Sequence, residues 1–355
     1  MFRWGIIGTG TVARKFVAGL RQSEGGKAVV AIGRDAARTA AFASDLRIAA
    51  SSIDLSAVVN RPDVDAFYIA TPPVAHLDAA LACIAAGKSV LIEKPMAASA
   101  TDTAAIISAA RAAGVFVMEG IWTRFLPLVT EVRSYLCNNR LGDIRSLEAS
   151  FGISNVADPR DNQFNARLGG GAMLHRGLYP LALALDLLGP ATLISSAATF
   201  GKTGVDEDVV ALLRHQTGAV STLRASLRAT LRNDITIEGT HGRIHIAAPL
   251  YRPWRAILTD VKPTLRTGSG SPRFERLRES TLVQGAAQRL SGLRQQGTTF
   301  TRYFTGNGYH YEADAVMAAV RAGMTECPLM TLNDSLAIAE MIDAARADWM
   351  EMPTE

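Results

Sequence analysis

The chain has 355 residues, of which 48% are hydrophobic and 20% charged, and its formal net charge is +4. This length predicts two domains, and the composition is that of an ordinary globular protein with enough apolar material for two cores. The three cysteines are widely spaced and form no CxxC pair, so neither a disulfide framework nor a zinc site is indicated, and no metal is expected. There is no apolar run long enough for a membrane span and no signal-peptide pattern, so we expect a cytoplasmic protein that does not bind membranes.

The first part of the chain alternates short apolar runs with amphipathic runs, which is typical of a parallel sheet covered by helices. We expect strands at residues 4–8, 28–33, 66–70, 89–92 and 115–118, and helices at 12–20, 35–46, 76–86 and 101–113. The pattern changes after Trp122. The sequence therefore predicts a dinucleotide-binding Rossmann domain at residues 1–122 and a second α/β domain, for substrate binding and oligomerisation, at 123–355.

Beyond residue 122, alternating and β-branched segments joined by turn residues predict a mainly antiparallel sheet with helices on one face. We expect strands at 144–153, 192–200, 209–214, 220–227, 235–239 and 243–247, and helices at 127–138, 309–322 and 332–349.

A basic stretch lies between Tyr251 and Thr305, with ten Arg and Lys residues against three acids. No stacking aromatics or recognition motif accompany it, so we expect no nucleic-acid partner and interpret the stretch as an exposed, Arg-rich surface. An oligomer contact and a surface that attracts an anionic substrate stay open as alternatives.

A GxGxxA motif joins the first strand to the first helix, formed by Gly8, Thr9, Gly10, Thr11, Val12 and Ala13. The first glycine permits the tight turn, the second lets backbone approach a pyrophosphate, and the small third residue lets helix and strand pack closely. The phosphates of a dinucleotide would then lie against the free N–H groups of the helix N-terminus. The alternative is a plain tight turn between strand and helix.

The end of the second strand predicts which cofactor is bound. NAD enzymes place an acid there on the ribose hydroxyls, whereas this chain has Gly33, which leaves space, followed by Arg34, a cation for a 2′-phosphate. Arg38 adds a second charge one helical turn on, and Asp35 is interpreted as the N-cap of the next helix. NADP(H) is therefore expected in preference to NAD(H). The alternative is that Arg34 only faces solvent.

Four further motifs follow in order along the chain: Thr71-Pro72 with His76, Glu93-Lys94-Pro95, the segment 119–127 (EGIWTRFLP) and the segment 169–180 (GGGAMLHRGLYP). Together with the glycine turn they resemble the glucose–fructose oxidoreductase, inositol dehydrogenase and rhizopine catabolism (Gfo/Idh/MocA) family. The segment 119–127 and the C-terminal segments resemble its dimeric dihydrodiol dehydrogenase branch.

The resemblance implies an NADP(H)-dependent dehydrogenase or reductase that acts on a hydroxyl-bearing carbon of a sugar, cyclitol or diol-type small molecule. It implies that Lys94 contacts the nicotinamide ribose and the substrate, that the Lys94–Pro95 bond is cis, and that Tyr179 donates or accepts the proton. It also implies a homodimer or homotetramer paired through the outer face of the second sheet. Thr71, Pro72, His76 and Glu93 are assigned with Lys94 to the cofactor site.

One position departs from the family pattern, because His175 stands where an Asp is usual, four residues before Tyr179. On a helix this spacing places both side chains on one face. A tyrosine hydroxyl, with a pKa of about 10, is a poor base at neutral pH, and a nearby Lys94 ammonium would lower that pKa. His175 titrates near neutrality and is expected to relay the proton or hold the substrate hydroxyl; the alternative is a histidine that only packs.

Trp122, Arg124 and Phe125 follow the last strand of the first domain and are expected to border the substrate. Trp122 offers an apolar wall, and Arg124 is expected to hold an anionic or polyhydroxylated substrate; their alternatives are interdomain core and a structural ion pair. The departure at His175 also keeps a second hypothesis for the whole protein, an NADP-binding sensor or regulator with impaired catalysis. The sequence leaves the identity of the substrate and the direction of reaction open.

Overall fold

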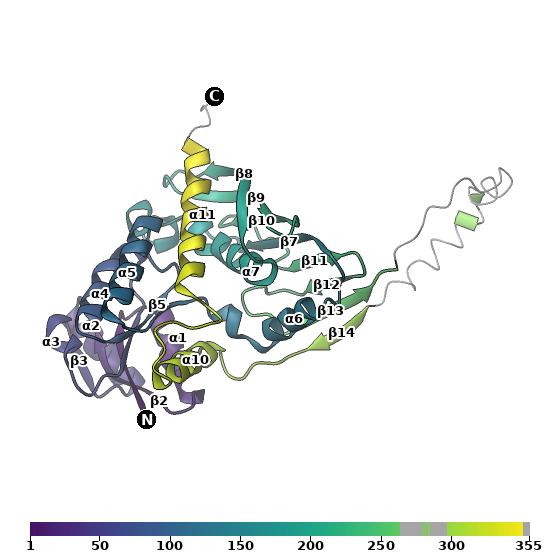
Figure 1. The fold of residues 1–355 in the computed structure, drawn as a ribbon. Helices are drawn as coiled ribbons and strands as arrows, with labels where there is room; N and C mark the ends of the chain where they lie inside the picture. The colour runs from purple at the N-terminus through teal and green to yellow at the C-terminus, as the bar shows by residue number, and fades with distance from the viewer. Residues whose placement is uncertain (263–279, 282, 285–296, 351–355) are drawn as a thin grey trace.

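The computed structural model describes residues 1–262, 280, 281, 283, 284 and 297–350. Two sheets lie beside each other, with helices on their faces and between them (Figure 1). The first sheet and its helices consist of β1 (Phe2–Ile7), α1 (Thr11–Gly19), β2 (Gly26–Ile32), α2 (Ala36–Leu46), β3 (Ala50–Ser52), α3 (Ser56–Val59), β4 (Ala66–Ile69), α4 (His76–Ala85), β5 (Ser89–Glu93), α5 (Ala100–Ala113) and β6 (Val117–Gly120).

The first sheet has six parallel strands in the order β3-β2-β1-β4-β5-β6, as expected for a Rossmann domain. Its central strands β1 and β4 are largely apolar and buried, because helices cover the sheet on each side. The strand order reverses beside β1, which opens the crevice where ligands bind at the carboxyl ends of such strands. Two elements escaped the sequence-based prediction: β3, which has three residues, and α3, which has four.

Local capping explains where the helices of this domain begin and end. The Asp35 side chain accepts the N–H of Arg38 at 2.7 Å, which confirms that Asp35 is the N-cap of α2. Ser99 caps α5 in the same way through the N–H of Asp102, and Gly114 ends that helix with a left-handed backbone.

The second sheet has eight strands in the order β14-β13-β12-β11-β7-β10-β9-β8. Only β7 and β10 pair in parallel, so the expected mainly antiparallel sheet is confirmed. The second part of the chain consists of α6 (Pro127–Cys137), β7 (Ile144–Gly152), α7 (Leu178–Leu188), β8 (Ala191–Phe200), β9 (Asp206–His215), β10 (Val220–Ser226), β11 (Ile235–Gly239), β12 (Gly242–Ile246), β13 (Arg255–Asp260), β14 (Thr298–Thr301), α10 (Tyr309–Arg321) and α11 (Leu332–Met350).

The last two helices return to the first sheet. α10 packs against α1, and α11 packs against α5 as well as against α7 and β8 of the second sheet (Figure 1). One continuous core of buried side chains therefore includes residues of both sheets, such as Trp4, Tyr68, Leu147 and Leu213. The two sheets are held together by these shared helices, so the C-terminal segment contributes to both domains.

Most of the basic stretch between Tyr251 and Thr305 lies outside the described residues, and its interpretation as an Arg-rich surface stays a prediction. Of its described cations, Arg302 forms an ion pair with Glu131 of α6. Within the part of the chain that the structure describes, no helix is long and apolar enough to span a membrane. The same residues contain no group of three or more side chains that could hold a metal ion.

Candidate active site

The β1–α1 turn forms a cradle for a dinucleotide at the carboxyl edge of the first sheet. Gly8 has φ +111°, and a Cβ there would lie 2.4 Å from the carbonyl oxygen of Ala70, so only glycine fits. At Gly10 a Cβ would meet nothing within 4 Å, which leaves the backbone open to a ligand. No side chain caps the N-terminus of α1, and Thr11 and Val12 are exposed, so the first N–H groups of this helix are available for a pyrophosphate.

NADP(H) was expected partly because Gly33 leaves space at the end of β2, and the structure contradicts this reason. Gly33 does not leave free space, because a Cβ there would lie 2.3 Å from Thr39 Oγ1 and 3.1 Å from Thr9 Cγ2. An acid is excluded at this position by close packing, since the Thr39 hydroxyl occupies the room and donates to the carbonyl of Asp35 at 2.6 Å. Arg34 and Arg38 are both exposed, and neither forms an ion pair within the described residues.

The turn after β4 is held to the turn after β5 by His76. This ring is 1% exposed, and its Nδ1 and Nε2 lie 2.9 Å from the carbonyl oxygens of Pro95 and Thr71. Burial lowers the pKa of His76. A neutral imidazole has one N–H, so His76 donates to one of these carbonyls while its other ring nitrogen faces the second, and the ring lies between the two ligand-facing turns. The Thr71 hydroxyl beside Pro72 is buried with no hydrogen-bond partner in the described part of the chain, which leaves it available for a ligand.

The side chain of Glu93 is directed into the protein, contrary to its assignment to the cofactor site. It accepts hydrogen bonds from the Tyr68 hydroxyl and, at 3.2 Å, from the N–H of Lys94. Burial raises the pKa of Glu93. Glu93 thus holds the start of the turn that carries Lys94, and the cis Lys94–Pro95 bond follows it as expected.

Lys94, His175 and Tyr179 meet where the two sheets approach each other. The Lys94 Nζ lies 4.8 Å from the centroid of the Tyr179 ring and donates to the carbonyl oxygen of His175 at 3.3 Å. Burial, together with the charge of Arg176, lowers the pKa of Lys94 to about 8. This lysine is thus held over the tyrosine face by backbone and poised to lose its proton near neutral pH.

His175 differs from the sequence-based expectation in geometry and in charge. Residues Met173–Gly177 form a π-helix, in which backbone bonds run from i to i+5, so a shared α-helical face for His175 and Tyr179 does not apply. The ring Nε2 lies 3.2 Å from the carbonyl oxygen of Gly169, and burial with the nearby Lys94 charge lowers the pKa of His175 to about 3. The ring is neutral at physiological pH, and the expected titration near neutrality is wrong.

Tyr179 is 9% exposed and lies against an aromatic wall. Its ring packs edge-on to Phe151 with centroids 5.5 Å apart, Tyr251 stacks on Phe151 at 5.2 Å, and Trp122 stacks on Tyr309 at 4.8 Å. Burial and the charge of Glu93 raise the pKa of Tyr179. The expected lowering of this pKa by Lys94 is therefore wrong. Phe151 and Tyr251 were not predicted as site residues, because no local pattern distinguishes them from other strand and turn residues.

Two of the three residues expected beside the substrate are used elsewhere. Arg124 is 1% exposed; it pairs with Asp334 at 3.2 Å and donates to the carbonyl of Ala182 at 3.0 Å, so it joins the chain after β6 to α7 and the start of α11. Phe125 is buried and lines a separate surface hollow beside α6. The structural alternative holds for Arg124, whereas Trp122 belongs to the aromatic wall.

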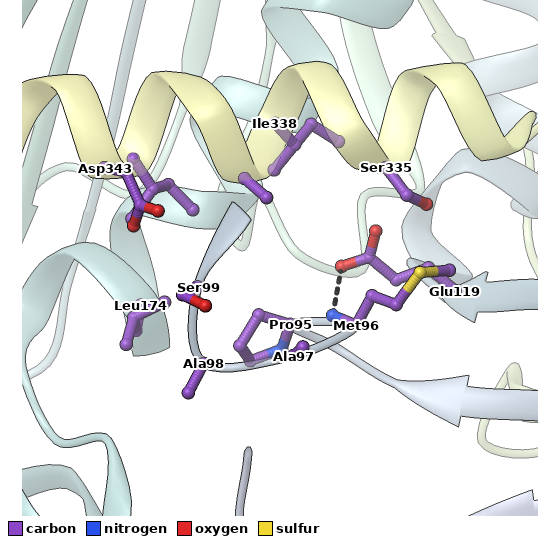
Figure 2. Close-up of a pocket in the computed structure, with 12 residues that line it drawn as sticks. Pro95, Met96, Ala97, Ala98, Ser99, Glu119, Leu174, Ser335, Ile338 and Asp343 are labelled. Atoms are coloured by element: carbon purple, nitrogen blue, oxygen red, sulfur yellow. Dashed lines mark hydrogen bonds between the residues drawn. The ribbon is translucent and has the colours of Figure 1, made fainter. Parts of the chain in front are cut away.

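Behind the Lys94–Pro95 turn, Glu119 lies between the first sheet and α11, beside Ser335 (Figure 2). Its Oε1 accepts the N–H of Met96 at 2.9 Å, while its Oε2 and the hydroxyl of Ser335 are buried without hydrogen-bond partners among the described residues. Both residues line a small hollow between the turn 95–99 and α11. Burial raises the pKa of Glu119 to about 7. Glu119 lies in the segment 119–127 that resembles the family, but no role was predicted for it from the sequence.

A Rossmann cradle beside a desolvated lysine and a buried tyrosine defines a nicotinamide-dependent oxidoreductase. Comparison with protein families agrees: residues 2–121 match the oxidoreductase family with an NAD-binding Rossmann fold, and residues 129–245 match the GFO/IDH/MocA C-terminal domain. The chain belongs to the GFO/IDH/MocA oxidoreductase family. Its members include relatives that match almost the full length of this chain.

Among these relatives, trans-1,2-dihydrobenzene-1,2-diol dehydrogenase of Sus scrofa is 31% identical over 349 residues, 97% of this chain and 96% of the relative. The enzyme of the same name from Bos taurus is 30% identical with the same coverage. A 3-ketoreductase from Actinomadura kijaniata, solved with NADP and TDP-benzene, has a similar fold, with a TM-score of 0.80, 22% identity and 98% coverage of each chain. Levoglucosan dehydrogenase, solved with NADH and levoglucosan, has a TM-score of 0.83 at 19% identity, with 99% of this chain and 97% of that chain covered.

The burial of Glu119 generates a prediction about stability. Because its folded-state pKa of about 7 lies above the ordinary value of 4.5, its contribution to stability is full below pH 4.5 and is lost as the pH rises to 7. Glu119→Gln keeps the acceptor for Met96 and does not titrate. We expect the free energy of unfolding of this variant, relative to the parent, to increase by about 3 kcal/mol between pH 4.5 and 8.

Urea unfolding at a series of pH values measures this difference. Glu340→Gln, at an exposed glutamate of α11, is the matched control and should show no such trend. A difference between Glu119→Gln and the parent that stays constant over the whole pH range would contradict the prediction.

Proposed function

We propose that this protein transfers a hydride between NADP(H) and the hydroxyl or carbonyl carbon of a sugar, cyclitol or diol-type small molecule. The observation that carries the proposal is the meeting of Lys94, His175 and Tyr179 at the carboxyl edge of the Rossmann sheet. The activities of the similar proteins, which include diol and levoglucosan dehydrogenases and a 3-ketoreductase, support this substrate class.

The residues of the cradle fit a dinucleotide. The uncapped N-terminus of α1 and the open backbone at Gly10 suit a pyrophosphate, the unpartnered Thr71 hydroxyl suits a polar group of the nicotinamide half, and Arg34 with Arg38 suits a 2′-phosphate. When bound, the nicotinamide supplies or accepts the hydride.

In this proposal Tyr179 acts as the proton donor when a carbonyl is reduced. Its raised pKa keeps it a neutral phenol, and the Lys94 ammonium over its ring stabilises the negative charge that develops on oxygen. In the reverse direction the same path runs backwards: Tyr179 takes the proton of the substrate hydroxyl while its own proton passes to neutral Lys94, whose pKa is about 8.

His175 holds the substrate in this proposal without relaying the proton. A carbonyl only accepts hydrogen bonds, so the neutral ring carries its hydrogen on Nε2, toward Gly169. The Nδ1 lone pair is then free to accept a hydrogen bond from a substrate hydroxyl. Of the two functional roles expected for His175, proton relay and holding the substrate hydroxyl, we therefore propose the second.

The first prediction from this mechanism concerns Tyr179 and Lys94. Tyr179→Phe should lower kcat about a hundred- to ten-thousandfold and leave NADPH affinity near that of the parent. The rate of alcohol oxidation should rise with pH to a plateau above pH 8, because Lys94 must be neutral, and the rate of carbonyl reduction should fall over the same range. Steady-state kinetics with NADP⁺ and sugars or diols, and with NADPH and ketoses or dicarbonyls, measure both effects.

Lys94→Arg is the matched control, since it keeps the positive charge but should remove the pH dependence near 8. Full activity of Tyr179→Phe with a good substrate would overturn the mechanism. Tight NADPH binding without turnover of any substrate in the panel would instead support the sensor.

The cofactor preference gives a second prediction. Arg34→Ala removes a cation that we assign to the 2′-phosphate, and a charge-assisted hydrogen bond of this kind contributes on the order of 1.5–3 kcal/mol. We expect about a ten- to hundredfold loss of NADPH affinity with little change for NADH, measured by titration of cofactor fluorescence. Arg21→Ala, at an exposed arginine far from the β2 end, is the control. Equal losses for both cofactors would contradict the assignment.

A third prediction concerns assembly. The exposed face of the second sheet carries apolar Ile194 and Val210, 43% and 42% exposed, among polar residues such as Arg224, and we propose that this face pairs with a second copy. Light scattering at micromolar concentration should report a dimer or tetramer, and Val210→Arg should weaken it. A monomeric parent protein would contradict this proposal.

A further inference from the structure

Arg176 presents a guanidinium group beside the proposed active site without an acidic partner. Its Cζ lies 5.0 Å from the centroid of Phe151, and its Nη2 donates to the amide oxygen of Gln163 at 2.8 Å. Its Nε is buried and has no hydrogen-bond partner among the described residues. Because Gln163 is neutral, the positive charge of Arg176 stays uncompensated.

The surrounding charges do not neutralise this guanidinium. Lys94 is a second cation beside Arg176, and the charge of Arg176 helps to lower the pKa of Lys94. Asp161 is the carboxylate with a favourable electrostatic effect on Arg176, yet it forms no ion pair with it and accepts the N–H of Gln163 at 3.0 Å. Glu93 is engaged by Tyr68 inside the protein. Within the described residues, the site therefore has an excess of positive charge on its substrate side.

A partly buried guanidinium without an ion-pair partner is unfavourable unless an anion binds to it. The anionic groups of the cofactor have other binding places, since the pyrophosphate fits the Gly8–Val12 turn and the 2′-phosphate fits Arg34 at the end of β2. Arg176 instead lies on the second-sheet side, in the π-helix that also positions His175, and stands against the same aromatic wall as Tyr179. The anion that pairs with Arg176 would therefore belong to the substrate.

We propose that Arg176 binds a carboxylate of the substrate, so that the substrate class is a polyhydroxy acid, such as a sugar acid, in preference to the neutral sugar or polyol. This inference rests on the proposed function and specifies its substrate. Guanidinium and carboxylate match in geometry, and the Nη1 of Arg176 has no hydrogen-bond partner among the described residues, so this part of the fork is available for the contact. Lys94 and His175 would then meet the hydroxyl-bearing carbon further along the same molecule.

The test uses matched pairs of ligands that differ only at one end: threonate with threitol, xylonate with xylitol, and gluconate with glucitol. Affinity is measured by calorimetry with NADP⁺-loaded protein, and kcat/KM by NADPH formation. We expect at least one aldonate to bind about tenfold more tightly than its alditol, and this preference to weaken as salt is raised. Arg176→Gln should reduce the aldonate-to-alditol ratio about ten- to hundredfold, and Arg176→Lys should restore part of it.

NADPH affinity and the thermal midpoint of each variant control for folding, because Arg176 also packs on Phe151. An unchanged aldonate-to-alditol ratio in Arg176→Gln would overturn the proposal, as would a preference for glucitol 6-phosphate over gluconate. The binding measurements are independent of turnover. An enzyme that oxidises alditols and aldonates equally well would refute the role of Arg176 and retain the proposed function, whereas selective aldonate binding without turnover would refute the function and retain the anion site.

Discussion

The desolvation of Lys94 is the constraint on which the rest of the site depends. An ammonium group taken out of water loses its proton more easily, and here burial lowers its pKa to about 8. Two hydrogen bonds hold Lys94 in place. The Glu93 side chain accepts one from the backbone N–H of Lys94, and the backbone carbonyl of His175 accepts one from the Lys94 ammonium. The lysine thus marks the point where the Rossmann sheet and the second part of the chain meet.

The backbone carbonyl that accepts the Lys94 ammonium belongs to His175, in the π-helix Met173–Gly177. A π-helix has a wider turn than an α-helix, because its backbone hydrogen bonds join residues five apart instead of four. π-turns of this kind occur frequently at functional sites. The same turn directs the ring of His175 to Gly169 and places Arg176 against Phe151, so one local irregularity positions three groups of the site.

Buried charge is also how α11 is joined to the Rossmann domain. Arg124 pairs with Asp334 just inside the N-terminus of α11, and Glu119 lies beside Ser335 one residue further on. Arg124 is buried while the Asp334 side chain is 39% exposed, so loss of Asp334 would leave a buried guanidinium without its ion pair. These contacts restrain the turn after Lys94 from behind, so the C-terminal helix helps to hold the geometry of a site formed by residues far earlier in the chain.

Local sequence determined the features that depend on near neighbours. The apolar runs of the parallel strands, the glycine turn at Gly8–Val12 and the N-cap at Asp35 are written in segments of a few residues, and the structure contains all three. No helix was predicted over α7, because this helix is buried nearly all round and lacks the polar stripe of an amphipathic helix.

Tertiary structure decided whatever depends on burial and on residues distant in sequence. The pKa values of Lys94, His175 and Glu119 are set by loss of water, which no local pattern records. Arg124 has the residue type of a substrate ligand, and only its contact with Asp334, more than two hundred residues away, shows its structural role. Sequence specifies which chemical groups are present, whereas the fold determines which of them lose water and which partner they find, and these two conditions define the chemistry of the site.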